Sequence, residues 1–266
     1  MKDMKIGIVG CGNMGSAIVR GILDKAIIPA DAMSLNDKDI EKAANLANQT
    51  GAHSRDLLEV VRNSDYLIIA VKPQEFEELI KDIAHEITHQ TIISIMAGIK
   101  IDVLADEIGK SVPIARAMPN IGAFIAKGVT CVSFNSLVED KDDIKGIFSG
   151  IGKVIEIEES LMDTVTAVSG SGPAYLFYFA EAMIEAAIEM GLAEDVAKEL
   201  VIEKFYGSSA LMKEGKDSPG ELIKKVASKG GTTEAALTVF EEKGLKSIIK
   251  SAMLKAKERS EELSKG

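Results

Sequence analysis

The chain has 266 residues, of which 46% are hydrophobic, and it carries a formal net charge of −10 at pH 7. This length is enough for one large or two medium domains with their own cores. The acidic balance argues against proteins that bind nucleic acid or anionic membranes. Two cysteines without motif spacing indicate a reducing compartment. The apolar run at residues 6–10 has only strand length, so we expect no signal peptide, no membrane span and a cytoplasmic location.

The N-terminal segment has the pattern of a strand, a glycine-rich turn and a helix. Residues 5–9 predict a buried parallel strand, and residues 17–23 predict a helix. Between them, Gly10, Gly12 and Gly15 have the G-x-G-x-x-G spacing, which allows a tight turn, close approach of a pyrophosphate and close helix–strand packing. A merely tight turn is the alternative, but the flanking elements favour a dinucleotide site. Its residues would be Gly10, Cys11, Gly12, Asn13, Met14 and Gly15.

Strands and helices then alternate along the N-terminal half. We predict strands at residues 32–36, 66–71, 91–95, 112–117, 129–134 and 154–157, with helices at 40–48 and 76–87. This order predicts a doubly wound parallel sheet, in which ligands bind beyond the carboxyl ends of the strands. The residues that follow those ends are therefore cofactor candidates. They are Ala70, Val71, Lys72 and Pro73, then Ala97, and then residues 118–120.

The choice between NADH and NADPH depends on the residues after the second predicted strand, Asn36 and Asp37. An acid at this point accepts hydrogen bonds from a ribose 2′-hydroxyl and repels a 2′-phosphate. Asp37 lies 22 residues after Gly15, close to the expected spacing of about 20. The pattern therefore favours NADH. Lys38 could soften the repulsion, so NADPH stays open.

Residues 85–89 match the zinc-binding pattern H-E-x-x-H. The motif lies at a predicted helix end, just before a strand, and no third ligand stands out, so we expect a polar helix terminus and no metal. We expect Cys11 to be a small side chain beside the cofactor rather than a redox thiol. Arg116 could meet a substrate carboxylate or form an ion pair at the end of the sheet.

From residue 161 onward the pattern is helical. We predict helices at residues 161–168, 174–190, 196–213, 221–226, 234–240 and 245–263. The break near residues 158–160 predicts a domain of residues 1–158 followed by an all-α domain of residues 159–266. Apolar residues surround the helix at 174–190, which predicts that it is buried on most sides with the help of a partner subunit.

A glycine–threonine stretch, Gly230-Gly231-Thr232-Thr233, lies between two predicted helices. Two glycines followed by threonines at a helix start leave backbone N–H groups unpaired and place hydroxyls beside them. Such a helix end favours a small anion, for example a carboxylate. An ordinary N-cap with a flexible leading turn is the alternative.

Six segments together resemble the pyrroline-5-carboxylate reductase family, in order along the chain. They are residues 5–18, 70–74, 94–99, 118–120, 169–175 and 226–237. The resemblance implies an N-terminal Rossmann domain, an interlocking helical dimerisation domain, and an active site between them with elements from both subunits. It implies reduction of the C=N bond of 1-pyrroline-5-carboxylate to L-proline by NADH or NADPH, the last step of proline synthesis. A homodimer is implied, and the number of dimers in a larger assembly stays open.

The resemblance also implies roles for single residues. The glycine loop would hold the pyrophosphate, and the residues after the strands would border the cofactor. Ser228 and the N–H groups of Gly231, Thr232 and Thr233 would bind the substrate carboxylate, and the Thr233 hydroxyl would lie near the ring nitrogen as the catalytic candidate. The chain departs from the family at Lys229 (usually proline), at Glu234 (commonly apolar), at Asp37 (arginine or serine in many members) and at residues 55–57, where an expected asparagine is missing.

Two other functions stay open. A related imine or β-hydroxyacid-type reductase is one, but the second kind needs a lysine on the first long helix of the second domain, and residues 172–190 contain none. A non-catalytic dinucleotide sensor is the other, and it would have no reason to keep a second anion site.

Overall fold

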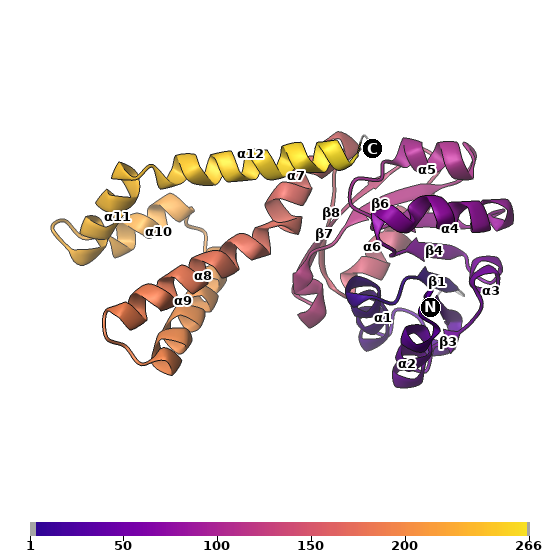
Figure 1. Ribbon diagram of the computed structural model, residues 1–266, viewed down its shortest axis with the longest axis horizontal. Coiled ribbons are helices and arrows are strands. Elements are labelled where there is room, and N and C mark those ends of the chain that lie inside the picture. The colour runs from indigo at the N-terminus through magenta and orange to yellow at the C-terminus, as the bar shows by residue number, and fades with distance from the viewer. Residues whose placement is uncertain (1–3, 265–266) are drawn as a thin grey trace. The chain divides into compact units, whose positions relative to one another are not determined.

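The computed structural model describes residues 4–264 and divides the chain into two compact units (Figure 1). The first unit contains the chain up to Ser171 together with its end from Ala256 onward, and the second unit is Gly172–Lys255. The sequence-based boundary between residues 158 and 159 stays a prediction.

The first unit is built on a sheet whose strand order is β3-β2-β1-β4-β5-β6-β7-β8. The strands are β1 (Ile6–Val9), β2 (Met33–Asn36), β3 (His53–Ser54), β4 (Tyr66–Ile69), β5 (Thr91–Ser94), β6 (Ile114–Met118), β7 (Gly128–Phe134) and β8 (Gly152–Glu156). The predicted doubly wound parallel sheet is confirmed, and most of its strand pairs are parallel. Two details differ: β6 and β7 pair antiparallel, and β3 was not predicted because two exposed residues give no hydrophobic pattern.

Helices cover both faces of this sheet (Figure 1). On one face lie α1 (Asn13–Asp24), α2 (Ile40–Thr50) and α6 (Lys141–Ser149), and on the other lie α3 (Leu57–Arg62), α4 (Phe76–Ile83) and α5 (Ile101–Ile108). Neighbouring residues of a strand point to opposite faces, so Ile68 belongs to one hydrophobic cluster while Leu67 and Ile69 belong to the other. Continuous apolar strands are therefore buried on both sides.

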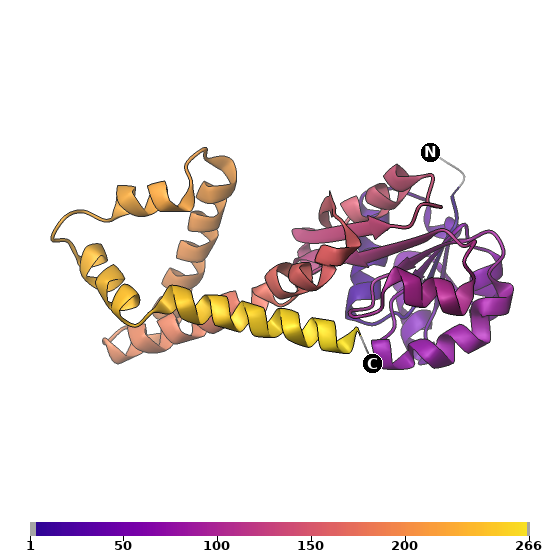
Figure 2. The same cartoon turned by 90° about the horizontal axis from the view of Figure 1, so that it is seen from above.

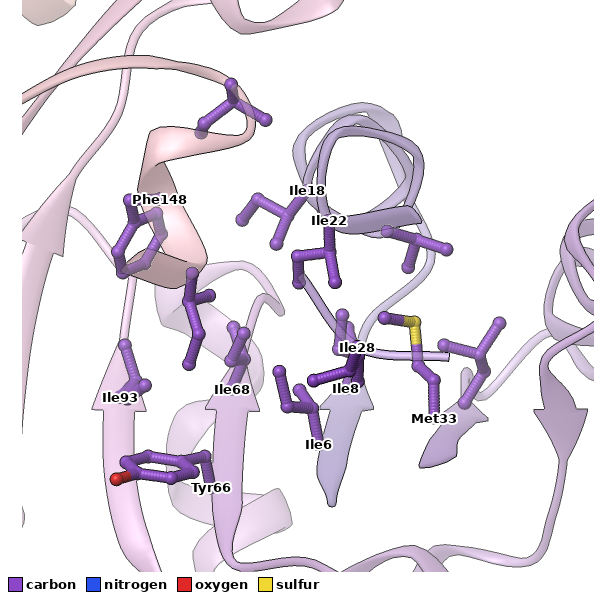
Figure 3. Close-up of a cluster of buried hydrophobic side chains, with 14 of the residues drawn as sticks. Ile6, Ile8, Ile18, Ile22, Ile28, Met33, Tyr66, Ile68, Ile93 and Phe148 are labelled. Carbon is purple, nitrogen blue, oxygen red and sulfur yellow. The ribbon is translucent and has the colours of Figure 1, made fainter. Parts of the chain in front are cut away.

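The packing of α1 against the sheet fixes the position of the glycine loop. Ile18 and Ile22 of α1 face Ile6 and Ile8 of β1, and Phe148 of α6 closes the same cluster (Figure 3). All five side chains have no exposed surface. Each contributes about 1.5–3 kcal/mol through burial, so the start of α1 is held firmly at the end of β1.

An ion pair connects β6 to the segment that follows β8. Arg116 is buried, and its guanidinium lies 3.3 Å from Glu159 Oε1. The same oxygen accepts the backbone N–H of Ile101, the first residue of α5, at 2.7 Å. Arg116 was expected to meet either a substrate carboxylate or an acid at the end of the sheet, and the structure favours the second role.

The C-terminal helix α12 (Leu245–Leu263) ends within the first unit. The Ser260 hydroxyl, which is buried, donates a hydrogen bond to Asp163 Oδ1 at 2.7 Å. A Cβ placed on Gly98 would lie 3.1 Å from the carbonyl oxygen of Leu263. The end of α12 therefore packs against the loop after β5, next to Ala97.

Helices make up the second unit, as predicted. They are α8 (Gly172–Glu189), α9 (Glu194–Glu214), α10 (Pro219–Val226), α11 (Thr232–Glu242) and the greater part of α12. Figure 2 shows α10 and α11 as separate short helices joined by the loop at residues 227–231. The helix predicted at 161–168 is instead α7 (Met162–Val165) followed by a π-helical turn, Thr166–Gly170.

The single chain covers one side of the helix at residues 174–190, and its predicted burial with the help of a partner subunit stays a prediction. α9 packs along one side of α8, and only Ala187 of α8 is buried. Phe177 and Tyr178 are 58% and 71% exposed. Apolar residues surround this helix, whereas the chain itself covers one side of it.

Within residues 4–264, no helix combines the length and the apolar character that crossing a membrane requires. No group of three or more histidine, cysteine, aspartate or glutamate side chains there is arranged to hold a metal ion.

Replacement of Glu159 by alanine is expected to lower the free energy of unfolding by about 2 kcal/mol, because it leaves a buried guanidinium and the first N–H of α5 without their acceptor. Urea titration measures this loss. The adjacent, exposed Glu158 is the matched control, and its replacement by alanine should cost less than about 0.5 kcal/mol. Equal losses for the two variants would contradict this role of Glu159.

Candidate active site

The carboxyl ends of four neighbouring strands lie level with one another. Val9 of β1 pairs in register with Asn36 of β2 and with Ile69 of β4, and Ile69 pairs with Ser94 of β5. The loops that follow these residues therefore leave the sheet at one edge. The structure brings most of the predicted cofactor residues together there: the glycine loop, Asn36 and Asp37, and residues 70–73.

The glycine loop ends at the N-terminus of α1, where Gly12 is the N-cap. Gly12 has no side chain to accept the first N–H groups of the helix, and the first turn contains no acid. Position 15 must be glycine because the backbone of Gly10 lies close to it: a Cβ on Gly15 would lie 1.9 Å from the carbonyl oxygen of Gly10. Open space surrounds the Cβ position of Gly12. This arrangement presents unpaired N–H groups and the positive end of a helix dipole to an anion.

The carboxylate of Asp37 is fixed against the glycine loop. Its Oδ2 accepts the N–H of Cys11 at 2.7 Å, and its Oδ1 accepts the N–H of Asp39 at 2.9 Å. A carboxylate has about four acceptor sites, so two remain for further donors such as ribose hydroxyls. Burial, with a smaller contribution from the charge of Asp37, raises the pKa of the Cys11 thiol to about 12. Cys11 is therefore a protonated, buried thiol.

The remaining predicted cofactor residues have mainly structural contacts. The side-chain amide of Asn36 donates to the carbonyl of Arg55 at 2.9 Å, and the N–H of Ala70 donates to Val9 O at 2.8 Å. Lys72 begins a short 3₁₀ turn, Pro73–Glu75, and its N–H donates to Glu75 Oε2 at 3.2 Å. Ala97 lies in the loop after β5, which is the neighbour of β4 in the sheet, and this loop packs beside the end of α12.

The H-E-x-x-H residues lie away from this edge, at the other end of the β5 strand. Glu86 pairs with Arg62, with Oε1 and Oε2 accepting guanidinium N–H groups at 2.5 and 2.6 Å. His85 is exposed, 3.5 Å from Glu86. This glutamate is occupied by a structural ion pair.

A second candidate anion site lies in the helical unit, at the start of α11. Gly231 is the N-cap, again without a capping side chain, and Thr232 and Thr233 form the first turn. Gly230 has φ +72°, a left-handed conformation that favours glycine. A Cβ on Gly231 would lie 2.6 Å from Ser228 Oγ, so the missing side chain lets the Ser228 hydroxyl lie against the helix start.

Two groups at this helix start already have partners. The N–H of Gly231 donates to Ser228 O at 3.0 Å, and the N–H of Gly230 donates to Glu234 Oε2 at 2.6 Å. The N–H groups of Thr232 and Thr233 therefore carry most of the capacity for an external anion. Glu234, one of the departures from the family pattern, adds a negative charge beside them.

Two family models match the chain. The model described as pyrroline-5-carboxylate reductase dimerisation matches residues 159–263, and the model described as NADP oxidoreductase coenzyme F420-dependent matches residues 5–98. The pyrroline-5-carboxylate reductase of Escherichia coli K12 is 37% identical over 99% of each chain. The chain belongs to the pyrroline-5-carboxylate reductase family. Its N-terminal unit is thus the Rossmann-type part of a family member that uses a nicotinamide dinucleotide.

Solved structures of the family have the same fold. The pyrroline-5-carboxylate reductase of Coxiella burnetii superposes with a TM-score of 0.93 at 30% identity and covers 100% of both chains. The Plasmodium falciparum enzyme, solved with NADP bound, gives a TM-score of 0.89 at 29% identity and covers 99% of both chains.

Three features of these sites could not be predicted from the sequence. The Glu75 carboxylate contacts both Lys38 and the backbone of Lys72. Glu234 caps the loop before α11. The hydroxyl oxygen of Tyr175, in the first turn of α8, is buried without a hydrogen-bond partner among the described residues. Long-range and loop contacts of this kind have no periodic signal in a sequence.

Replacement of Gly12 by alanine is expected to raise the dissociation constant for NADH about tenfold or more, because the new methyl group takes the space into which a pyrophosphate approaches. The fold should be preserved, since φ at Gly12 is −68° and its Cβ position is free. Calorimetric titration with NADH measures the affinity, and a thermal scan should give a Tm within about 2 °C of the parent. Gly146, equally open but on α6, is the control. Undiminished NADH binding by the Gly12→Ala protein would contradict the predicted loop function.

Proposed function

We propose that the chain reduces the C=N bond of 1-pyrroline-5-carboxylate to L-proline with NADH or NADPH, as the last step of proline biosynthesis. The observation that carries this proposal is the 37% identity to the E. coli reductase over 99% of both chains. Two anion-binding helix starts, one in each unit, match the two charged parts of this reaction, a dinucleotide and a small carboxylic acid. A cytoplasmic location remains a prediction from the sequence.

The edge of the sheet fits a nicotinamide dinucleotide in three respects. The start of α1 offers unpaired N–H groups, Gly12 leaves room for close approach, and Asp37 keeps free acceptor sites. We therefore propose that the glycine loop holds the pyrophosphate and that Asn36 and Asp37 lie at the adenosine ribose. Ala70, Val71, Lys72, Pro73 and Ala97 would border the rest of the cofactor. When bound, the reduced dinucleotide supplies the hydride that the imine carbon receives.

The helical unit would bind the substrate. The N–H groups of Thr232 and Thr233 and the hydroxyl of Ser228 would hold the carboxylate, with Gly231 keeping Ser228 close. This clamp fixes one end of the ring, so that the imine carbon can be held about 3–3.5 Å from the hydride donor. A protonated cyclic imine is already electrophilic, and orientation is therefore the main task of the chain.

Thr233 is the proposed catalytic residue. Its hydroxyl belongs to the same helical turn as the carboxylate clamp, which suits a hydrogen bond to the ring nitrogen of the bound imine. A threonine hydroxyl is a poor acid, so its first role would be orientation and its second would be delivery of the nitrogen's proton, directly or through water.

NADH is the proposed preferred cofactor. The Asp37 carboxylate is held by two backbone N–H groups at the end of β2, where the ribose 2′-hydroxyl of a dinucleotide is read. A fixed negative charge there accepts the hydroxyl of NADH and repels the phosphate of NADPH.

A homodimer through the helical unit is the proposed assembly. Large apolar side chains of α8 and α9 are exposed in the single chain, among them Leu176, Phe177, Leu200, Ile202 and Tyr206. An apolar surface of this kind marks a protein interface. The match of residues 159–263 to a dimerisation domain supports the same assignment.

The proposed reaction is tested by loss of reduced-nicotinamide absorbance on addition of 1-pyrroline-5-carboxylate, with NADH and NADPH in separate assays. Replacement of Thr233 by alanine should lower kcat/KM about 10- to 100-fold, because the hydrogen bond to the ring nitrogen is lost, and serine should restore most of it. Thr238, in the middle of α11, donates to a backbone carbonyl and is the control. Absence of turnover with both cofactors would overturn the function, whereas unchanged kcat/KM in Thr233→Ala would overturn only the role of Thr233.

Replacement of Glu234 by glutamine is expected to lower the KM for 1-pyrroline-5-carboxylate about two- to fivefold. The amide oxygen can still accept the N–H of Gly230, but the charge that repels the substrate carboxylate is gone. The effect should shrink at high salt. Glu242, at the other end of α11, is the matched control and should have no effect as glutamine. A higher KM in Glu234→Gln would show that the charge helps binding instead.

A further inference from the structure

An ion pair between Lys38 and Glu75 spans the carboxyl end of β1. Lys38 follows β2, which ends at Asn36, and Glu75 follows β4, which ends at Ile69. β2 and β4 are the two neighbours of β1 in the sheet, and the glycine loop leaves β1 between them. The ion pair therefore joins the two loops on either side of the proposed dinucleotide site.

Glu75 is the anchored partner of this pair. One of its carboxylate oxygens contacts the Lys38 ammonium, and the other accepts the N–H of Lys72 at 3.2 Å. The Glu75 side chain is 28% exposed, whereas that of Lys38 is 78% exposed. The pKa of Glu75 is lowered, chiefly by its hydrogen bond with Lys38, and the pKa of Lys38 is raised by the same contact. Lys38 is thus a flexible cation drawn toward a fixed carboxylate.

The position of Lys38 gives this contact a consequence for the cofactor. Lys38 directly follows Asp37, the acid that would read the ribose 2′-position. A 2′-phosphate there meets the charge of Asp37, and a nearby cation is what commonly accommodates it. The ammonium of Lys38 could supply that charge, but Glu75 already neutralises it.

We propose that Glu75 is a cofactor-selecting residue, which disfavours NADPH by holding Lys38 away from the 2′-phosphate. Asp37 repels the phosphate, and Glu75 removes the cation that would offset this repulsion. NADH has no charge at the 2′-position, so the ion pair leaves its binding unaffected. This inference rests on the proposed function, because it assumes a nicotinamide dinucleotide bound at the glycine loop.

The test is replacement of Glu75 by glutamine in the full chain. Glutamine keeps an oxygen for the N–H of Lys72, so the turn at Pro73–Glu75 is preserved, while Lys38 is released. Exposed ion pairs are weak in water, so a modest effect is expected: the dissociation constant for NADPH falls about fivefold and that for NADH changes less than about twofold. Both constants are measured by calorimetric titration without substrate, and the NADPH effect should diminish at high salt.

A double-mutant cycle with Lys38→Met decides whether the effect passes through Lys38. In the Lys38→Met background, Glu75→Gln should no longer change the ratio of the two dissociation constants. Glu156, which pairs with Lys141 and Lys145 at the far edge of the sheet, is the matched control for glutamine replacement. An unchanged ratio in Glu75→Gln, or an effect that persists without Lys38, would overturn the proposal. These experiments measure cofactor binding without substrate. Failure of the chain to reduce 1-pyrroline-5-carboxylate would appear in the activity assay alone, so it can be distinguished from failure of this proposal.

Discussion

The proposed function depends on unpaired backbone N–H groups at two helix starts that are led by glycine. At Gly12 and at Gly231 the N-cap residue has no side chain to satisfy the first turn, so each helix presents donors and a positive dipole end to an external anion. Folding the core around Ile18 and Ile22 fixes the first of these starts at the end of β1. A left-handed Gly230 shapes the second. Neither proposed site needs a basic side chain, which is compatible with the net charge of −10.

An acidic side chain lies beside each helix start, where its negative charge would affect the binding of an anionic ligand. Asp37 lies against the glycine loop and Glu234 against the loop before α11, and each carboxylate accepts backbone N–H groups of the loop itself. These acids order the loops, and at the same time they place negative charge next to a proposed anion. We therefore propose that these carboxylates, which accept loop N–H groups and add negative charge beside each helix start, contribute to the selectivity of both sites. Glu75 is a third such acid, which we propose neutralises the charge of Lys38 through their ion pair.

The sequence predicted the parts of the molecule that repeat or follow strict backbone rules. Apolar strands, the spacing of Gly10, Gly12 and Gly15, and the change to helices after residue 161 were sufficient for the fold class, because burial and glycine geometry act locally. The sequence could not predict the antiparallel pairing of β7, the return of Ser260 to Asp163, or the contacts of Glu75 and Glu234. These depend on residues that only the folded chain brings together. The apolar pattern of α8 predicted burial with the help of a partner subunit, and the exposure of Phe177 in the single chain is consistent with that expectation.

We propose that the start of α11 is a carboxylate site that serves the reaction. A crystal structure of the protein with NADH and L-proline tests it most directly, because the reduced cofactor and the reduced product cannot react with each other. The proline carboxylate is expected within hydrogen-bond distance of the N–H groups of Thr232 and Thr233, with the ring nitrogen next to the Thr233 hydroxyl. Proline bound at another place, with the helix start occupied only by solvent, would contradict it.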